Sequence, residues 1–394
     1  MAVKKKSNIQ NNINSDNPIE KESTEESDLI KDLITSLNKE HGHKIAYNLS
    51  IDEAPTIVKR WISTGSKLLD YAIACKKGGG LPEGRIIEIF GPPSTGKSHL
   101  ALQACISTQK MGGIVVYIDT ENATSIENLQ NLGVDIKRRF VFVETSCTED
   151  VFSTIESTIL KMKTLKKDVP VLVVWDSVAA TSPKKELLGE YDQETIGLQA
   201  RAISKGMRKI TNVVGDNNVT LLCLNQTRMK IGVMFGDPTT TPGGMAIPFH
   251  ASVRISLSGG SKIENKNGDV VGINVIAKII KNKVATPHKR VEYKIIFGKG
   301  IDESEQIFDL LKEKSPVVLD NKTKVVVSGE GAWKTIVVTD VDGVVLEEKK
   351  FTKAQFEEII NDSKFSNYIE LCIDKINVSQ DLSEEMPIIP INEN

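Results

Sequence analysis

The chain has 394 residues, a formal net charge of −2, 40% hydrophobic and 26% charged residues, an ordinary globular composition that predicts two or three domains. No apolar stretch approaches the ~18 residues of a membrane-spanning helix, so we expect neither a signal peptide nor a membrane location. The five cysteines are scattered without C-x-x-C pairs, which favours a reducing cytoplasm and argues against structural zinc.

Charge is unevenly distributed along the chain. Residues 301–394 contain 20 acidic and 10 basic side chains, whereas residues 201–254 contain seven basic and two acidic ones. The overall net charge therefore neither supports nor excludes nucleic acid as a partner. The local excess of positive charge in 201–254 is the informative feature.

The N-terminal segment divides into an arm and a helix. Residues 1–26 are rich in Asn, Ser, Lys and Glu and poor in large apolar residues, which predicts a disordered arm. A short helix is predicted after Ser27, a good N-cap, and is expected to end near Gly42. Its apolar stripe has no core of its own, so residues 27–61 are expected to pack on another surface, such as a neighbouring subunit.

Residues 62–300 alternate apolar strands with helices, the pattern of an α/β fold with a mostly parallel sheet covered by helices on both faces. The strands expected in the parallel part are Ile86–Phe90, Ile114–Asp119, Phe140–Glu144, Val169–Trp175 and Val219–Leu224. Three later runs lack long helices between them and predict an antiparallel edge: Ser252–Leu257, Gly272–Ile280 and Arg290–Phe297.

Beyond residue 300 the composition becomes acidic, and residues 301–378 are predicted to form a small α+β domain. Short helices are expected near Glu305–Lys312 and Lys353–Ile360, and strands at Lys324–Val327 and Ile336–Val338. Residues 379–394 contain proline and polar residues and are expected to form a flexible tail.

The strongest motif follows the strand Ile86–Phe90. The sequence GPPSTGKS at residues 91–98 matches G-x-x-x-x-G-K-[ST], and a helix is predicted over His99–Met111. Glycines let the backbone curl around phosphate oxygens, and the helix N-terminus favours an anion. We therefore predict that the chain binds a nucleoside triphosphate with Mg²⁺, Lys97 reaching the phosphates and Ser98 the metal. The residues expected to hold the nucleotide here are Gly91, Pro92, Pro93, Ser94, Thr95, Gly96, Lys97, Ser98 and His99.

Three polar side chains follow other strands of the predicted sheet, at the edge where ligands bind in such folds. Asp176 ends an apolar run, as expected for a carboxylate beside Mg²⁺, although Asp also suits a helix N-cap. Glu121 is placed to orient or deprotonate water, and an ordinary helix-start carboxylate is an equal alternative. Gln226 could sense the γ-phosphate, although its position alone supports this weakly.

The segment Thr227–Ala246 predicts a long functional loop without obvious regular structure. It combines Arg228 and Lys230 with apolar side chains such as Ile231, a combination that suits single-stranded nucleic acid. A flexible surface loop with incidental charge is the alternative. A second loop, Thr181–Gly197, follows Asp176 on the same edge of the sheet, so both loops could share a ligand.

At these residues the chain resembles the bacterial RecA recombinases from about Asp28 to Glu303. The matching stretches are ISTGSKLLD (62–70), GLPEGRIIEIFGPPSTGKS (80–98), YIDTENA (117–123), VVWDSVAA (173–180), GLQARAISKGMRK (197–209), NQTRMKIGVMFGDPTTTPGGMAIPFHASVR (225–254) and IKNKVATPHKRVEYKIIFGKGI (280–301). The block at 225–254 is the most specific, because replicative helicases share the ATP site but not this loop. The resemblance implies a RecA-like P-loop ATPase core.

The resemblance also implies an activity: a filament on single-stranded DNA that uses ATP and Mg²⁺, pairs with homologous duplex DNA and exchanges strands. It implies self-association into a helical polymer, with repressor or accessory proteins as further partners. Position by position, Lys97 and Ser98 bind the phosphates and the metal, and Asp176 supports the metal. Glu121 is the catalytic carboxylate, and Gln226 relays the γ-phosphate to DNA.

Further residues acquire roles from the resemblance alone. Ile196 and Ile231 match residues that wedge into stretched DNA. Positions that contact the DNA backbone are matched by Arg201, Arg208, Arg228, Gly243 and Gly244. Lys281 and Lys283 match lysines that reach the ATP of the adjacent subunit, although strand periodicity alone makes them solvent-facing. The N-terminal helix, a strand from Ala54–Trp61 and Phe249 match the polymerisation interface.

The chain departs from the family at two positions: Asn128 replaces a Tyr that stacks on adenine, and Pro248 replaces a basic interface residue. Two other functions fit the same ATP core. A hexameric helicase-like motor predicts closed rings, and a nucleotide-gated scaffold predicts hydrolysis that DNA does not accelerate.

Overall fold

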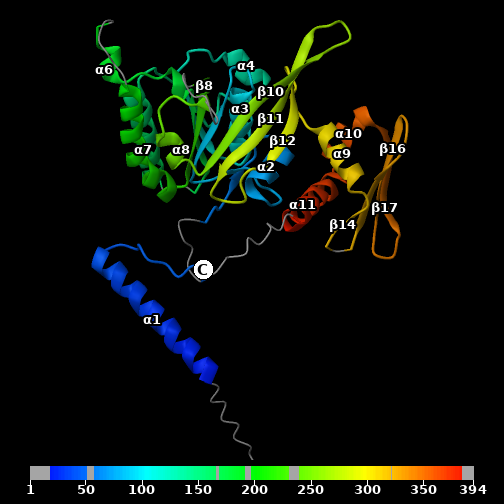
Figure 1. Ribbon diagram of the computed structural model, residues 1–394, viewed down its shortest axis with the longest axis horizontal. Coiled ribbons are helices and arrows are strands. Elements are labelled where there is room, and N and C mark those ends of the chain that lie inside the picture. Colours follow the sequence, from blue (N-terminus) through cyan, green and yellow to red (C-terminus); the bar gives the residue numbers. More distant parts are fainter. Residues whose placement is uncertain are drawn as a thin grey trace, which may run out of the picture. The chain divides into compact units, whose positions relative to one another are not determined.

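The computed structural model describes residues 18–50, 57–165, 168–190, 197–229, 239–320 and 322–383 (Figure 1). The chain divides into two compact units, Met1–Ile57 and Val58–Asn394. Within the described residues, no helix has the combination of length and apolarity needed to cross a bilayer.

The first unit contains one long helix, α1 (Pro18–His41). It begins well before Ser27, so the expectation of disorder over 1–26 is wrong for residues 18–26; residues 1–17 lie outside the described residues. Proline is favoured at a first helical position, and the Glu- and Lys-rich sequence that follows contains good helix formers. After the helix, Asn38 Oδ1 accepts hydrogen bonds from the Ile45 (2.7 Å) and Ala46 (2.9 Å) amides, which folds the chain back on the helix end.

The second unit is built on a nine-stranded sheet. In spatial order its strands are β13 (Gly300–Asp302), β12 (Arg290–Ile296), β11 (Val270–Asn282), β10 (Val253–Glu264), β3 (Ile86–Gly91), β7 (Val219–Gln226), β6 (Val171–Asp176), β4 (Ile114–Asp119) and β5 (Phe140–Glu144). The strands from β10 to β5 run parallel, and β10 to β13 pair antiparallel. The predicted α/β fold and its antiparallel edge are confirmed.

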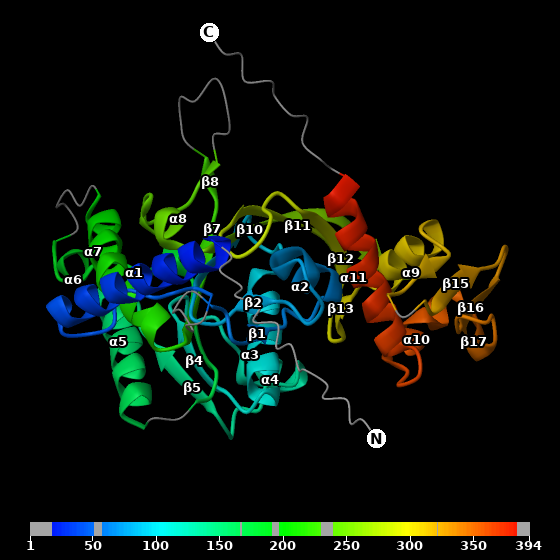
Figure 2. The same cartoon turned by 90° about the horizontal axis from the view of Figure 1, so that it is seen from below.

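Helices cover both faces of the sheet, and each face has its own apolar core (Figure 2). One core contains side chains of α2 (Lys67–Ala74), α3 (Lys97–Lys110) and α4 (Ile126–Asn131). The other contains side chains of α5 (Thr148–Leu165) and α7 (Leu198–Asp216). Strands buried on both faces read as continuous apolar runs, which is why their bounds were readable from sequence.

The remaining core elements are short. They are the ribbon of β1 (Trp61–Ile62) and β2 (Leu81–Pro82), the ribbon of β8 (Arg228–Met229) and β9 (Thr239–Thr240), the 3-10 helix η1 (Val178–Ala180), α6 (Lys184–Leu187) and α8 (Ala246–His250). The expected polymerisation strand falls partly on residues 54–56, outside the described residues.

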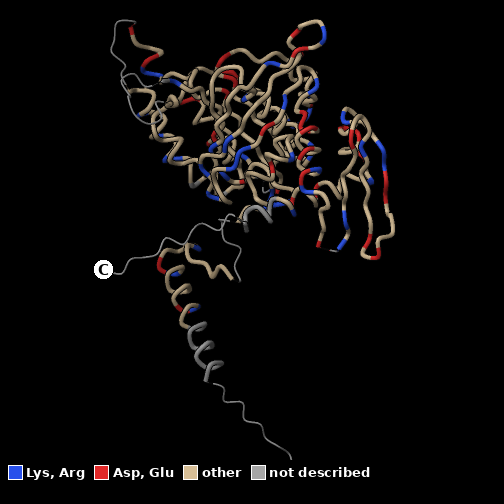
Figure 3. Tube along the Cα trace, turned by 45° about the vertical axis from the view of Figure 1, so that its right-hand side comes forward, with Lys and Arg blue, Asp and Glu red and all other residues tan. Residues whose placement is uncertain are grey.

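After β13 the chain enters a smaller α+β domain with a separate apolar core. Its elements are α9 (Ser304–Glu313), β14 (Val317–Val318), β15 (Lys324–Ser328), β16 (Trp333–Thr339), β17 (Val345–Thr352), η2 (Lys353–Gln355), α10 (Phe356–Asn361) and α11 (Ser366–Ser383). Figure 3 shows acidic and then basic residues following one another along the edge strand β17. The four consecutive charged residues interrupt any apolar pattern, which explains why β17 was not predicted from the sequence. α11 also passes the boundary expected at residue 378.

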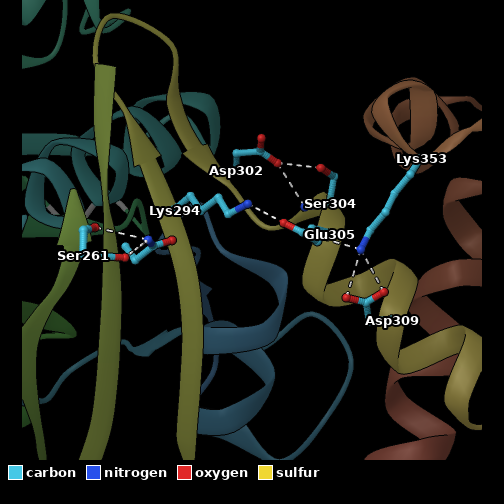
Figure 4. Close-up of polar contacts among 8 residues, drawn as sticks. Ser261, Lys294, Asp302, Ser304, Glu305, Asp309 and Lys353 are labelled. Atoms are coloured by element: carbon cyan, nitrogen blue, oxygen red, sulfur yellow. Dashed lines mark hydrogen bonds and ion pairs between the residues drawn. The ribbon is translucent and has the colours of Figure 1, made fainter. Parts of the chain in front are cut away.

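The small domain is joined to the core by ion pairs centred on Glu305, the first-turn acid of α9 (Figure 4). Lys294 on β12 donates to Glu305 Oε2, and Lys353 Nζ donates to Glu305 Oε1 (2.9 Å) and to Asp309 Oδ1 (3.1 Å). The buried Glu303, which directly precedes α9, accepts a hydrogen bond from the Ser66 hydroxyl (2.6 Å) at the start of α2. The two parts are therefore tied together by side chains from both.

Candidate active site

The loop of residues 91–98 has backbone conformations that its glycines permit. A Cβ on Gly91 would lie 2.2 Å from the Leu257 carbonyl oxygen, so only glycine fits there. Gly96 precedes α3 with φ of 87°, and Ser94 has φ of 59°. The Thr95 hydroxyl donates to the Pro92 carbonyl (2.9 Å), which closes the turn. The loop thus leads from a buried strand into a helix N-terminus, as the motif predicts.

Lys97, the first residue of α3, folds back over this loop. Its Nζ donates to the carbonyl oxygens of Gly91 (3.1 Å) and Pro92 (2.7 Å). Burial lowers the pKa of Lys97, and the charges of Asp176 and Glu121 oppose that shift. The Lys97 ammonium therefore lies within electrostatic range of the carboxylates of Asp176 and Glu121, at the loop where a phosphate group would bind. Burial also lowers the pKa of His99, which lies two residues further along α3.

Ser98 and Asp176 meet at the ends of α3 and β6. Asp176 accepts hydrogen bonds from the Ser98 side chain and from the Tyr117 hydroxyl, whose oxygen lies 2.6 Å from Oδ2. Burial raises the pKa of Asp176, and these two hydrogen bonds oppose that shift. The helix-cap interpretation of Asp176 is wrong, because the carboxylate accepts from these side chains instead. A hydroxyl and a carboxylate are the oxygen ligands that Mg²⁺ prefers, so the pair fits the metal.

Glu121 and Gln226 are in direct contact. Gln226 Nε2 donates to Glu121 Oε1 (2.9 Å), and the Ser177 hydroxyl donates to the same oxygen. Glu121 is not a helix-start residue, because α4 begins at Ile126 with Ser125 as its N-cap. Strand register places Gly91 opposite Gln226, so this carboxylate–amide pair lies at the same sheet edge as the phosphate-binding loop.

The two lysines near the end of β11 have different surroundings. Lys281 Nζ donates to the carbonyl oxygens of Pro248 (2.7 Å) and Phe249 (2.8 Å) of its own chain. Burial, followed by the charge of Lys283, lowers the pKa of Lys281. The solvent-facing interpretation is therefore wrong for Lys281, whereas Lys283 is exposed. Phe249 is 72% exposed, unusual for a large apolar side chain.

The residues expected to contact DNA are brought together in part. Arg201 and Arg208 lie exposed on α7, and Arg228 lies exposed on β8. A Cβ on Gly243 would lie 2.8 Å from Ile203 of α7, and one on Gly244 would lie 3.3 Å from Ala200. The end of the long loop thus packs on the helix that carries the two arginines. Three further residues lie outside the described residues: Ile196, Lys230 and Ile231.

The expectation of no regular structure over Thr227–Ala246 is wrong at its two ends. β8 and β9 form an antiparallel ribbon in which Arg228 pairs with Thr240, and α8 begins at Ala246. Two-residue strands carry no period that a sequence can show.

Sequence reasoning missed four residues that support the site. These are Tyr117 and Ser177, which hold Asp176 and Glu121, and the buried ion pair of Glu88 with Arg254 (2.5 Å). A signal was present for Glu88, because a charged residue in the middle of the apolar strand 86–90 requires a buried partner. No comparable signal marks Tyr117, since an aromatic residue in a strand is usually core.

The parallel sheet, the strand–loop–helix of residues 86–110 and the Ser98–Asp176 pair define a P-loop nucleotide hydrolase. Comparison with known proteins narrows the class. A family model described as the RecA N-terminal domain matches residues 28–302. Protein RecA of Geobacter sulfurreducens is 40% identical over 306 residues, which are 76% of this chain and 82% of that protein. Protein RecA of Mesomycoplasma hyopneumoniae is 38% identical over 73% of this chain and 82% of its own length.

A third relative extends into the C-terminal domain: Protein RecA of Lactococcus lactis subsp. cremoris is 37% identical over 336 residues, 84% of this chain and 80% of that protein. The chain belongs to the RecA family. It is an ATP-dependent recombinase of DNA recombination and repair, and its enzymatic activity is that of a DNA-dependent P-loop ATPase.

Proposed function

We propose that this protein polymerises with ATP into a helical filament on single-stranded DNA, pairs that strand with homologous duplex and exchanges the strands. The observation that carries the proposal is the 2.9 Å hydrogen bond from Gln226 to Glu121. It joins a carboxylate at the nucleotide site to the strand that leads directly into β8 and the basic segment, residues 227–246. Gln226, assigned to the nucleotide, and Arg228, assigned to DNA, are thereby two positions apart along the chain.

The nucleotide chemistry is assigned as follows. Residues 91–99 cradle the phosphates through the backbone amides of their non-proline members, and Lys97 supplies the cation that compensates the phosphate charge. Ser98 and Asp176 are the residues that would hold Mg²⁺, which neutralises phosphate charge when bound. Glu121 acts as the base that accepts the proton of the attacking water, and Gln226 and Ser177 orient its carboxylate.

The site is completed by an adjacent copy of the chain. Lys281 and Lys283 are assigned to the neighbour's phosphates, which couples hydrolysis to polymerisation, since a cation supplied in trans can raise such rates by roughly 10³–10⁵. For Lys281 this requires exchange of the Pro248 and Phe249 carbonyls for phosphate oxygens. The exposed ring of Phe249 supports an interface on this surface.

The DNA backbone is assigned to the arginines Arg201, Arg208 and Arg228 together with Lys230 and the amides of Gly243 and Gly244. Ile196 and Ile231 are assigned as apolar wedges between bases. Repressor or accessory proteins are further proposed partners. The five free cysteines support a reducing compartment, and we infer the cytoplasm.

Electron microscopy combined with a strand-exchange assay tests the proposal. With ATP, Mg²⁺ and single-stranded DNA we expect helical filaments, hydrolysis accelerated by the DNA, and transfer of a strand from homologous but not heterologous duplex. Closed rings with unwinding activity would instead indicate a helicase-like motor. Hydrolysis equally fast without DNA would indicate a nucleotide-gated scaffold.

A further inference from the structure

A buried polar cluster lies one residue before Gln226, between three strands of the sheet. Asn225 on β7 and Glu88 on β3 are both 0% exposed. Arg254 on β10 donates from Nε to Glu88 Oε2 (2.5 Å), and its guanidinium lies 4.7 Å from the centre of the Phe90 ring. Buried polar groups are costly unless satisfied, so the contacts of this cluster define what it does.

Asn225 connects this cluster to two different segments. Its Nδ2 donates to Glu88 Oε1 (3.1 Å) and to the carbonyl oxygen of Pro242 (3.1 Å). Its Oδ1 accepts from the backbone amide of Gln226 (3.0 Å). Both side-chain amide protons of Asn225 are therefore donated. One goes to Glu88 on the sheet, and the other goes to Pro242 near the C-terminal end of the basic segment.

The Pro242 end of that segment is packed against α7. Pro242 and Gly243 are buried, and the Gly243 backbone approaches Ile203 so closely that a Cβ would lie 2.8 Å from it. A shift of Pro242 is therefore expected to move residues 242–244 against α7, the helix that carries Arg201 and Arg208.

We propose that Asn225 is a positioning residue that couples the nucleotide site to residues 242–244 by holding Gln226 and Pro242 in one register. The inference rests on the proposed function and deepens it: Gln226 reads the nucleotide, and Asn225 transmits its position to the carboxyl end of the DNA-contacting segment. Asn225 itself touches neither ligand.

A purely structural role makes a different prediction. If Asn225 only satisfied the buried Glu88, its substitution would lower stability and leave the coupling unchanged. The two roles separate because the contacts with Glu88 and Pro242 use different amide protons.

The test is Asn225→Asp, which keeps the shape but removes both donors and faces two acceptors. We expect the ratio of DNA-stimulated to DNA-free ATP hydrolysis to fall about tenfold, because an unsatisfied buried acceptor has an effect of that order. Hydrogen exchange at the Gly243 and Gly244 amides supplies a readout independent of activity. Nucleotide should slow it in the natural protein and not in the variant.

Two further variants distinguish coupling from stability. Combining Asn225→Asp with Glu88→Gln restores the hydrogen bond between these side chains with donor and acceptor exchanged, but leaves Pro242 without a donor. We expect the melting temperature to recover and the stimulation ratio to remain low. Cys223→Ser places a hydroxyl at a buried site on the same strand. It is expected to lower the melting temperature without changing the ratio.

Each outcome is decisive. Natural protein whose hydrolysis is not accelerated by single-stranded DNA refutes the proposed function. A second outcome overturns only the role of Asn225. In it, DNA stimulates hydrolysis by the natural protein, and the folded Asn225→Asp variant has a ratio of DNA-stimulated to DNA-free hydrolysis that differs by less than about twofold. Recovery of the ratio in the exchanged pair also overturns it. Should Asn225→Asp fail to fold, Asn225→Ala removes the same donors without adding a charge, and the same limits on the ratio apply.

Discussion

At the scale of single residues, the charge balance of the nucleotide site depends on groups that lie outside the motif. The Lys97 ammonium is held by carbonyls of its own loop, and the carboxylates Asp176 and Glu121 favour its charged form against burial. Hydrogen bonds from Tyr117 and Ser98 in turn favour the ionised form of Asp176 against the effect of burial. The buried Tyr117 therefore contributes to the charge balance of the site, as Lys97 of the motif does.

Lys97→Ala tests the phosphate-binding loop directly. Removing the ammonium should reduce DNA-stimulated ATP hydrolysis by roughly a hundredfold or more, as loss of one preorganised charge-stabilising group does in other active sites. Steady-state phosphate release measures it, with a melting curve to show that the fold persists. Near-normal turnover in the folded variant would contradict the assignment.

Tyr117→Phe tests the support of Asp176. The Tyr117 hydrogen bond lowers the pKa of Asp176 against the effect of burial, so its loss should raise that pKa. Because ionised Asp176 is the form assigned to Mg²⁺, the acid limb of the pH dependence of hydrolysis should move to higher pH.

The Tyr117→Phe effect should shrink as the pH rises and Asp176 becomes ionised in both proteins. Phe142→Leu, which alters a ring stacked 6.3 Å from Tyr117 but removes no donor, is the matched control. An acid limb that moves equally in both variants would mean that packing, and not the hydroxyl, sets the profile.

At the scale of elements, two connections hold functional parts of the chain in place. The ribbon of β8 and β9 fixes both ends of the basic segment at the sheet edge beside Gln226. At the other side of the unit, the first turn of α9 bonds to β12 and to η2 through Glu305. Each connection can be tested by one substitution.

Arg228→Ala removes a cation from the ribbon. Loss of one phosphate contact reduces counterion release, so the slope of log binding constant against log salt should become shallower by about 0.7 for single-stranded DNA of any sequence. Fluorescence anisotropy over a salt series measures it. Lys262→Ala, on the β10 strand away from this ribbon, is the control whose slope should not change. An unchanged slope for Arg228→Ala would remove it from the DNA interface.

Glu305→Gln tests the junction with the C-terminal domain. Hydrogen bonds from Lys294 and then Lys353 lower the pKa of Glu305 to about 2, from 4.5. A lowered carboxyl pKa contributes stability above pH 4.5 that is lost as pH falls toward 2. Because this side chain is 45% exposed, solvent screening limits the contribution to about 1 kcal/mol.

Urea unfolding should therefore separate natural protein and Glu305→Gln by about 1 kcal/mol at pH 7 and by much less at pH 3. Glu292→Gln breaks an ion pair with Arg290 between two half-exposed side chains and is the control. A difference that is as large at pH 3 as at pH 7 would show that packing, and not charge, accounts for the effect.

At the scale of the whole molecule, the described residues of the first unit, 18–50 and 57, contribute to none of the apolar cores. The α1 side chains Leu29, Ile30 and Leu33 are exposed, although an apolar stripe of this kind needs a partner surface. The resemblance to RecA recombinases assigns that surface to a neighbouring subunit.

Deleting residues 1–57 should leave the second unit folded and monomeric, with an unchanged melting temperature within a few degrees. Filament formation on single-stranded DNA should be lost, and DNA-stimulated hydrolysis should fall about tenfold or more because no neighbour completes the site. Light scattering and electron microscopy measure assembly. Filaments of normal length from the truncated chain would assign polymerisation to another surface.

Much of the fold was readable from sequence because strands buried on both faces are continuous apolar runs. The bounds of the buried strand Ile114–Asp119 agree with the structure residue for residue. Those of Phe140–Glu144 agree as well, although this edge strand is partly exposed. The charged strand β17 and the helical residues 18–26 were missed, since neither carries an apolar pattern. The phosphate-binding loop could also be predicted from the sequence, because its glycines are required by local backbone conformation and close contacts.

The sequence by itself determined the nucleotide chemistry of this protein, because one continuous loop carries the groups that a triphosphate needs. The tertiary structure alone decided which side chains serve that loop. Tyr117 meets Asp176, Gln226 meets Glu121, and Asn225 meets Pro242 only after separate strands align at one sheet edge. Such contacts depend on strand order and register, and no spacing along a single segment encodes them.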